Sequence, residues 1–166
     1  DFKSPVEQIF DVPADWNVLA NGTLVENYVN QGHRAIYHWR ANYPIPSYLI
    51  SMVAGPLMVV DGGDSQSKIP IQYWVPAADV NAAKIGFKLT PEMVRFYSSK
   101  LMDYPYDKYA VGVAFGFRGA MEHTSATTFG EDLKIAGGGF DAAINAHELS
   151  HHWFGDTVTC KTWNDL

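Results

Sequence analysis

The sequence predicts an α+β fold in which a β-rich first half is followed by a half that mixes helices and strands. Two observations lead to this prediction. Runs rich in β-branched and aromatic residues recur up to Pro76, separated by turn residues about every ten positions. After Ala77, apolar residues follow a helical spacing in two segments, with strand-like runs between them. We therefore expect a β domain in residues 1–80 and a mixed domain in residues 81–166.

In the first half, Asn21-Gly22 in WNVLANGTLVEN stands between two strand-like runs and predicts a β-hairpin. The runs RAIYHWRA and SYLISMVAG predict further strands. The turn DGGD (61–64) then leads to IPIQYWVP, a strand bounded by Pro70 and Pro76. Together these runs predict a meander. Hydrophobic residues make up 47% of the chain, which is enough for a packed core.

The second half begins with the segment LTPEMVRFYSSKLMDYP, which predicts a helix. Thr90 is the expected N-cap, and Pro91 suits the first helical position. The residues expected on its core face are Met93, Phe96, Tyr97 and Leu101. YAVGVAF and GFRGAMEHTSATTFGE predict a strand, a loop and a second strand, with Tyr104, Tyr106 and Tyr109 as core and loop aromatics. The last helix follows GGG (137–139), with Asp141 as its cap and Gly155 at its end.

Composition excludes several classes of protein. The formal net charge is −6 and the twelve Lys and Arg residues are scattered, so a nucleic-acid-binding surface is not expected. A single cysteine, Cys160, allows neither an internal disulfide nor a cysteine-rich zinc module. The longest apolar stretch, Tyr48 to Val60, is too short to span a bilayer. The sequence leaves cytoplasmic and exported locations, and the oligomeric state, open.

The segment NAHELSHHWFGD contains the pattern H-E-x-x-H on the last predicted helix. His147 and His151 lie four residues apart, so they point to the same side and their imidazoles can share a cation; nitrogen ligands suit zinc. Glu148 lies about 100° around the helix, where it can exchange a proton with zinc-bound water. His152 points away and is interpreted as structural. The residues expected to pack into the core are Ala142, Ala146, Leu149 and Trp153.

The helix alone leaves two questions open. Histidines on helices are usually surface residues or hydrogen-bonded core residues, so the motif also fits an ordinary helix. A catalytic zinc also takes a third protein ligand. After His151, the candidate carboxylates are Asp156, which follows the helix end too closely to fold back easily, and Asp165. These residues alone do not assign the third ligand.

Further motifs extend the pattern beyond this helix. The chain contains, in this order, the motifs GAMEH (119–123), HELSHHWFGD and TWNDL (162–166). In these motifs and their order it resembles the M1 family of zinc metallopeptidases, the gluzincin aminopeptidases. Weaker similarity lies in YLISMVAGP and TPEMVRFYSSKLMDYPYDKY, so the resemblance covers nearly the whole chain. It implies the end of an all-β N-terminal domain followed by the start of a thermolysin-like zincin catalytic domain.

The resemblance implies that His147 and His151 bind Zn²⁺ and that Glu148 is the general base. In the family pattern H-E-x-x-H-x18-E, the third ligand is a glutamate nineteen positions after the second histidine, whereas fifteen residues follow His151. We expect that glutamate, and the family's oxyanion-stabilising tyrosine, beyond Leu166. A chain truncated before this ligand is expected to bind zinc weakly, to have little activity and to self-associate through exposed apolar surface.

The resemblance also implies a peptide substrate with a free amino terminus. Glu122 would bind the α-ammonium group, because a fixed carboxylate beyond the first subsite restricts cleavage to the first peptide bond. Gly119 and Ala120 would lie along the substrate backbone, where small side chains permit close approach. His123 stands where the family usually has Asn; both residues hydrogen-bond, but His also titrates near neutral pH.

The function predicted from the sequence is a zinc-dependent aminopeptidase that removes the N-terminal residue from peptides. Metal-activated water would attack the peptide bond, with a glutamate as general base. One alternative is a thermolysin-like endopeptidase, which needs the zinc helix but gives Glu122 no role. Another is a non-catalytic binding or scaffold domain. A zinc hydrolase of a different substrate, as in the family's epoxide-opening branch, is a further alternative.

Overall fold

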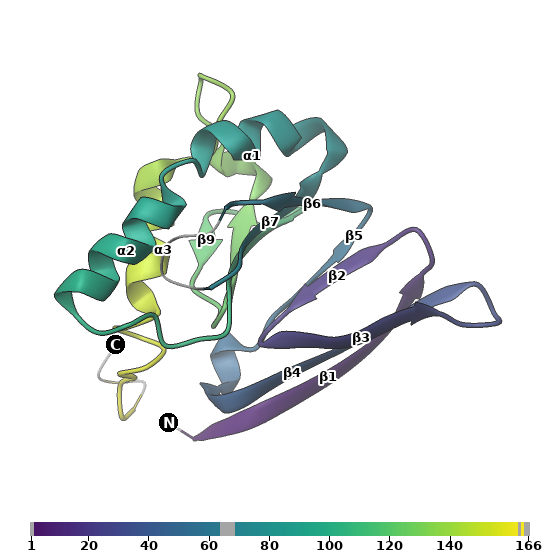
Figure 1. Ribbon diagram of the computed structural model, residues 1–166, viewed down its shortest axis with the longest axis horizontal. Helices are drawn as coiled ribbons and strands as arrows, with labels where there is room; N and C mark the ends of the chain where they lie inside the picture. Colours follow the sequence, from purple (N-terminus) through teal and green to yellow (C-terminus); the bar gives the residue numbers. More distant parts are fainter. Residues whose placement is uncertain (1, 64–68, 163, 165–166) are drawn as a thin grey trace.

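Figure 1 shows a computed structural model of the protein, which describes residues 2–63, 69–162 and 164. Its strands are β1 (Lys3–Pro13), β2 (Asn17–Ala20), β3 (Thr23–Val29), β4 (Arg34–Pro46), β5 (Met52–Gly55), β6 (Leu57–Asp61), β7 (Ile71–Pro76), β8 (Tyr109–Ala114), β9 (Ala120–Met121) and β10 (Ala126–Gly130). The helices are α1 (Val80–Gly86), α2 (Thr90–Lys100) and α3 (Ala142–His151), with 3-10 turns η1 (Ser47–Leu49), η2 (Ala77–Asp79) and η3 (Glu131–Leu133). Asp165, one of the candidate ligands, lies outside the described residues.

The strands form three sheets within the described part of the chain. β1, β4 and β3 make an antiparallel sheet with β4 in the centre, and β2 pairs with β5. The largest sheet has the order β6-β7-β8-β10-β9, with β7, β8 and β10 parallel and the outer strands antiparallel to their neighbours. The three α-helices lie on one side of this sheet and the two smaller sheets on the other (Figure 1). The predicted α+β class is confirmed.

Both faces of the three central strands, β7, β8 and β10, are buried, because each face packs against a different layer. Tyr73 of β7 and Val111 of β8 belong to the core under the helices. Trp74 and Ala110, one residue along each strand, point to the opposite core. There Trp74 meets Trp39 of β4 edge to face, with ring centroids 6.1 Å apart. The sheet is therefore the middle layer of the molecule.

Aromatic rings join the helices to this sheet. Phe87, which follows α1, stacks on Phe140 with ring centroids 5.0 Å apart and meets Phe129 of β10 edge to face at 5.3 Å. At Gly86 the backbones approach so closely that a Cβ atom would lie 2.0 Å from the backbone nitrogen of Phe140. The helix α1 was not predicted from the sequence. No helix in the described ranges is long and apolar enough to cross a membrane.

The predicted hairpin at Asn21-Gly22 is wrong. β2 and β3, on either side of these residues, belong to different sheets. The Asn21 side chain is buried and bonded to other segments, donating to the carbonyls of Leu49 at 3.0 Å and Thr124 at 2.6 Å. Gly22 has the positive φ of +80° that the dipeptide favours. The dipeptide therefore makes a turn as expected, but this turn is buried and connects strands of two different sheets.

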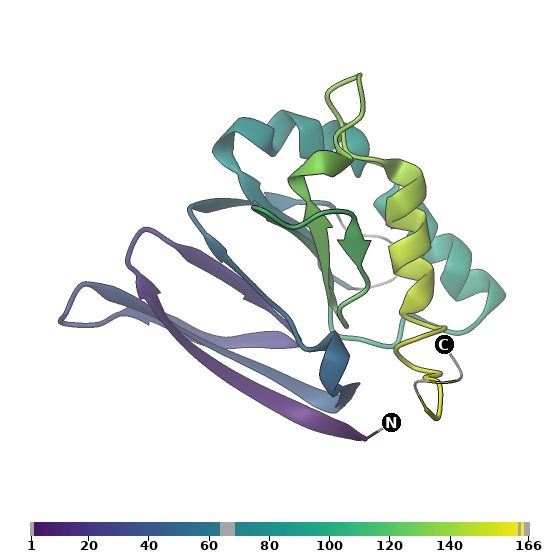
Figure 2. The same ribbon diagram turned by 180° about the vertical axis from the view of Figure 1, so that it is seen from behind.

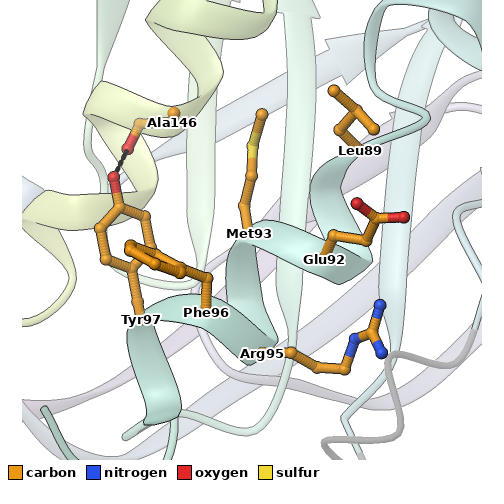
Figure 3. Close-up of a pocket in the computed structure, with 7 residues that line it drawn as sticks. All are labelled: Leu89, Glu92, Met93, Arg95, Phe96, Tyr97 and Ala146. Carbon is orange, nitrogen blue, oxygen red and sulfur yellow. Dashed lines mark hydrogen bonds between the residues drawn. The ribbon is translucent and has the colours of Figure 1, made fainter. Parts of the chain in front are cut away.

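The start of α2 differs from the prediction, and its predicted core face is only partly confirmed. Thr90 is the first helical residue, and the N-cap is Leu89, which makes no side-chain cap. Met93 and Tyr97 pack against the core as expected, at half-buried positions, whereas Phe96 is 58% and Leu101 45% exposed. The fully buried residues of the helix are Thr90 and Val94. Phe96 instead lines a hollow of about 440 Å³, shown in Figure 3, together with Leu89, Glu92, Met93, Arg95, Tyr97 and Ala146. Tyr97 closes one side of it by donating to the Ala146 carbonyl at 3.1 Å.

The predicted boundary near residue 80 falls between β7 and α1. Strands from before it, β6 and β7, and strands from after it, β8, β9 and β10, belong to one sheet. The two ends of the chain also meet, because Lys3 of β1 donates to the carbonyl oxygens of Asp156 at 2.7 Å and Thr157 at 3.0 Å. The division into residues 1–80 and 81–166 remains a prediction.

Candidate metal centre

The helix that carries the H-E-x-x-H pattern starts at the predicted cap. The Asp141 carboxylate accepts hydrogen bonds from the N–H groups of Ala143 at 2.8 Å and Ile144 at 3.2 Å. These bonds satisfy two of the free N–H groups in the first turn of α3. The helix ends at His151, and Gly155, with a φ of +135°, follows in the next turn.

A buried polar residue fixes the rotation of α3 about its axis. Asn145 is fully buried, donates to Thr90 Oγ1 at 2.8 Å and accepts from Tyr109 Oη at 2.8 Å. Leu149 and Trp153 are buried as predicted, while Ala142 and Ala146 are half-buried. Because the Asn145 side chain is held from α2 and β8, the opposite side of the helix is held facing outward.

His147 and His151 lie on that outward side with their rings together. Their Nε2 atoms are 3.1 Å apart. Two nitrogen ligands of a tetrahedral zinc ion lie about 3.3–3.4 Å apart, so the pair is close to the spacing for one shared ion. His151 Nδ1 lies 3.0 Å from the Phe154 carbonyl oxygen, which only accepts, so Nδ1 carries the hydrogen and Nε2 offers its lone pair. The pair fits two positions of a zinc site.

The carboxylate of the motif, Glu148, is buried beside this pair at 5% exposure. Burial raises the pKa of Glu148 to about 7, and the Glu122 carboxylate adds to this effect, while His151 opposes it. Glu148 is therefore buried close enough to His151 and Glu122 for their charges to affect its pKa, whereas His147 is exposed. A carboxylate in this environment is suited to exchanging a proton near neutral pH.

The segment with the second motif runs along α3 on strand β9, at one edge of the five-stranded sheet (Figures 1 and 2). Gly119 precedes the strand with a φ of +74°; its N–H donates to Asp132 Oδ1 at 3.2 Å and its carbonyl accepts from Gly130 at 2.7 Å. Ala120 then pairs with Phe129 of β10. These contacts direct the chain towards the histidine pair.

Glu122 follows β9 and completes the group of side chains around the pair. Its Oε1 atom lies 3.9 Å from His151 Nδ1, and its side chain is 17% exposed. His123 turns to the other side, where Nδ1 lies 2.9 Å from Thr128 Oγ1. Burial lowers the pKa of His123, against the opposing charge of Glu122. The structure thus brings together the four side chains His147, Glu148, His151 and Glu122, with His123 next to them.

His152 has the structural position expected for it. It is fully buried, with Nδ1 2.6 Å from Tyr104 Oη and Nε2 3.2 Å from Thr127 Oγ1. Burial lowers the pKa of His152 to about 3. Tyr104, Tyr106 and Tyr109 are likewise buried, as predicted.

Asp156, the other candidate third ligand, is buried in the turn after α3. It is 1% exposed, and its backbone N–H donates to the His151 carbonyl at 3.0 Å. Burial raises the pKa of Asp156 to about 8. Across residues 2–63, 69–162 and 164, no three His, Cys, Asp or Glu side chains converge as a metal site. Within this part of the chain, the histidine pair has no third protein ligand.

Sequence reasoning missed the residues that hold the loop after Glu122. Asn21 and Lys108 contact this loop, and Asn21 is 103 residues away from the Thr124 carbonyl that it binds. The dipeptide Asn21-Gly22 can be recognised in the sequence, but it predicts only a turn and does not indicate which segment the turn contacts.

Comparison with known proteins agrees with this geometry. The family model for the peptidase family M1 domain matches residues 85–166, about half of the chain. Leukotriene A-4 hydrolase of Xenopus laevis is 30% identical over 153 residues, which are 90% of this chain and 24% of that protein. Aminopeptidase N of Streptomyces lividans is 30% identical over 179 residues, covering 100% of this chain and 20% of that protein. The chain thus spans about a quarter or less of the length of these relatives.

Solved structures share the fold. The M1 zinc metallopeptidase from Deinococcus radiodurans superimposes with a TM-score of 0.78 at 22% identity, over 98% of this chain and 37% of that one. A mutant of that protein bound to a Tyr-Ser-Ala substrate gives a TM-score of 0.82, also at 22% identity and with the same coverage. The match over residues 85–166 and the relatives at 30% identity show that the chain belongs to peptidase family M1.

Proposed function

We propose that the protein containing this chain is a zinc-dependent aminopeptidase that hydrolyses the N-terminal residue from peptides. The observation that carries this proposal is the meeting of the His147 and His151 Nε2 atoms at 3.1 Å, beside the carboxylates of Glu148 and Glu122. Relatives named aminopeptidase N and aminopeptidase M1 support the same activity.

His147 and His151 would hold the zinc ion through Nε2. Bound zinc would polarise the scissile carbonyl and make hydroxide available near neutral pH. In the family pattern the third ligand is a glutamate, and two imidazoles alone bind zinc weakly. We expect calorimetric titration of this 166-residue chain to show weak zinc binding. Tight binding of one zinc ion per chain would contradict the two-ligand reasoning.

Glu148 would act as the general base. It lies beside the ligands and is largely removed from solvent, so it can take a proton from the attacking water and pass it to the leaving amine. Glu148→Gln keeps the size and removes the basic oxygen. We expect this change to lower kcat by roughly 10²–10⁴-fold with little change in zinc content.

Glu122 would bind the α-ammonium group of the substrate. β9 is an edge strand of its sheet in the described residues, so an extended peptide can pair beside Gly119 and Ala120. Such a peptide would have its amino terminus near Glu122 and its first peptide bond near the histidine pair. His123, directly after Glu122, would border the same subsite.

The experiment compares two fluorogenic dipeptides, one with a free amino terminus and its N-acetylated twin. It uses the longest natural chain that contains these residues, loaded with zinc. We expect a preference of at least roughly 10-fold in kcat/KM for the free amine, because a charged hydrogen-bonded pair is lost on acetylation. Glu122→Gln should abolish the preference. Glu131→Gln, which changes an exposed carboxylate on η3, is the matched control and should keep it.

The other outcomes favour the alternatives. Equal cleavage of both dipeptides would indicate an endopeptidase, in which Glu122 has no role. Cleavage of neither, with zinc bound in stoichiometric amount, would indicate a binding or scaffold domain. Zinc content is therefore measured by elemental analysis on the same samples.

A further inference from the structure

The loop of residues 122–125, called the Glu122 loop below, is bound from the β-rich half of the molecule by the buried side chain of Asn21. Asn21 is 1% exposed and makes three hydrogen bonds. It donates to the Leu49 carbonyl at 3.0 Å and to the Thr124 carbonyl at 2.6 Å, and it accepts from the Ser51 N–H at 2.7 Å. Asn21 therefore joins the β2–β3 turn, the η1–β5 segment and the loop after Glu122.

The adjacent residues reinforce this connection. Gly22 N–H donates to Ser125 Oγ at 2.9 Å, and the buried Lys108 Nζ donates to the Gly22 carbonyl at 2.5 Å. Ser125 has a φ of +61°, which is uncommon for a residue with a side chain. A Cβ atom on Gly22 would lie 2.1 Å from the Arg40 carbonyl oxygen, so the turn is also tightly packed from behind. The loop is thus held in a strained conformation by fixed partners.

The strand that carries the site motif has little hold on the loop by itself. β9 contains two residues, and its pairing with β10 ends at Met121 and Thr128. Between them, Ala126 N–H donates to the His123 carbonyl at 2.9 Å. The position of Glu122 therefore depends on how Thr124 is held. The bond from Asn21 to the Thr124 carbonyl, at 2.6 Å, is shorter than the bond from the Thr124 N–H to the Leu49 carbonyl, at 3.3 Å.

We infer that Asn21 is a positioning residue for Glu122: by holding the Thr124 carbonyl, it fixes the carboxylate relative to the histidine pair. This inference rests on the proposed function, in which Glu122 binds the substrate ammonium group. The distance from that carboxylate to the metal decides which peptide bond is reached, so a side chain of the β-rich half would enforce cleavage after the first residue.

The test measures kcat and KM of Asn21→Ala, in the longest natural zinc-loaded chain, for the free-amine dipeptide and its N-acetylated twin. We expect KM for the free amine to rise and the preference for it to fall by roughly 10-fold or more. Asn17→Ala is the matched control. It removes the bond that Asn17 donates to the Leu57 carbonyl at 2.8 Å and the bond that it accepts from Tyr37 Oη at 2.6 Å, neither of which involves the Glu122 loop, and it should keep the preference.

A double variant separates positioning from general loss of structure. In a Glu122→Ala background, Asn21→Ala should not lower kcat/KM for the free amine any further, because the two residues act through one contact, whereas a general loss of structure would lower it again. If Asn21→Ala does not fold, Asn21→Asp is used, which keeps the acceptor for Ser51 N–H and loses the amide donor to the Thr124 and Leu49 carbonyls. An unchanged preference in the folded variant, an equal fall in Asn17→Ala, or an additive effect in the double variant would overturn the inference. Failure of the proposed function is recognised separately, as absence of the preference in the unaltered enzyme.

Discussion

Lys108 provides a quantitative test of the buried junction between the two halves. It is 5% exposed, and its Nζ donates to the carbonyls of Ala20 at 2.9 Å and Gly22 at 2.5 Å. The ammonium also lies 4.8 Å from the centre of the Trp39 ring. Burial lowers the pKa of Lys108 from 10.5 to about 7, and Asp107 opposes this effect.

The lowered pKa predicts a dependence of stability on pH. Between about pH 7 and 10.5, the unfolded chain holds a proton on Lys108 that the folded protein has released. The free energy of unfolding therefore rises with pH by up to about 1.36 kcal/mol per pH unit. Between pH 7.5 and 9.5, this group is expected to add roughly 2–3 kcal/mol to stability. Lys108→Met keeps most of the volume and removes this contribution.

The assay is urea denaturation followed by tryptophan fluorescence, in the presence of a chelator, at pH 7.5, 8.5 and 9.5. The quantity of interest is the difference in unfolding free energy between the unaltered protein and Lys108→Met, because other titrating groups cancel in it. We expect this difference to move in favour of the unaltered protein by roughly 2–3 kcal/mol over this range. Lys88→Met, at an exposed position, should follow the unaltered protein. A difference that stays constant with pH would refute the reasoning.

Three further predictions concern the packing, capping and titration of the helices. Gly86→Ala should lower the unfolding free energy by at least about 2 kcal/mol, because the new Cβ meets Phe140 at 2.0 Å, whereas Gly137→Ala, in open space, should be nearly neutral in the same urea titration. Asp141→Ala should cost about 1 kcal/mol by removing two hydrogen bonds from the first turn of α3, and Asp141→Asn should cost clearly less in thermal unfolding. Burial lowers the pKa of His152 in the folded protein to about 3, so the contribution of its neutral ring to the unfolding free energy is fully present above pH 6.5 and is lost as the pH falls. Between pH 6.5 and pH 4, the unfolding free energy of His152→Gln should therefore fall by roughly 3 kcal/mol less than that of the unaltered protein.

The sequence predicted the structure best where the contacts of a residue lie within a few positions along the chain. Asp141 caps α3 because the hydrogen bonds of a cap lie within one turn. His147 and His151 meet because helical spacing alone brings residues four apart together. The buried position of His152 followed from the same geometry.

The sequence was least informative where the partner is distant along the chain. Asn21-Gly22 favours a two-residue hairpin, yet its partners are Leu49, Thr124 and Ser125, and long-range hydrogen bonds override the local preference. On α2, the apolar spacing indicated the face with Phe96, but the buried face contains Thr90, whose hydroxyl accepts from Asn145. A buried polar pair has no signature in hydrophobic periodicity.

The contact between Lys3 and the carbonyl of Asp156 has a consequence for the order of folding. The two residues are 153 positions apart, and the intervening strands β7, β8 and β10 are parallel, so each pairing waits for a crossover segment. During synthesis, β1 leaves the ribosome before the turn after α3 and cannot make this contact until that turn has also emerged. Contacts of such long sequence separation form slowly, and unpaired strand edges meanwhile remain open to other chains. The histidine pair should therefore reach its final surroundings only after strands β1 to β8 have emerged.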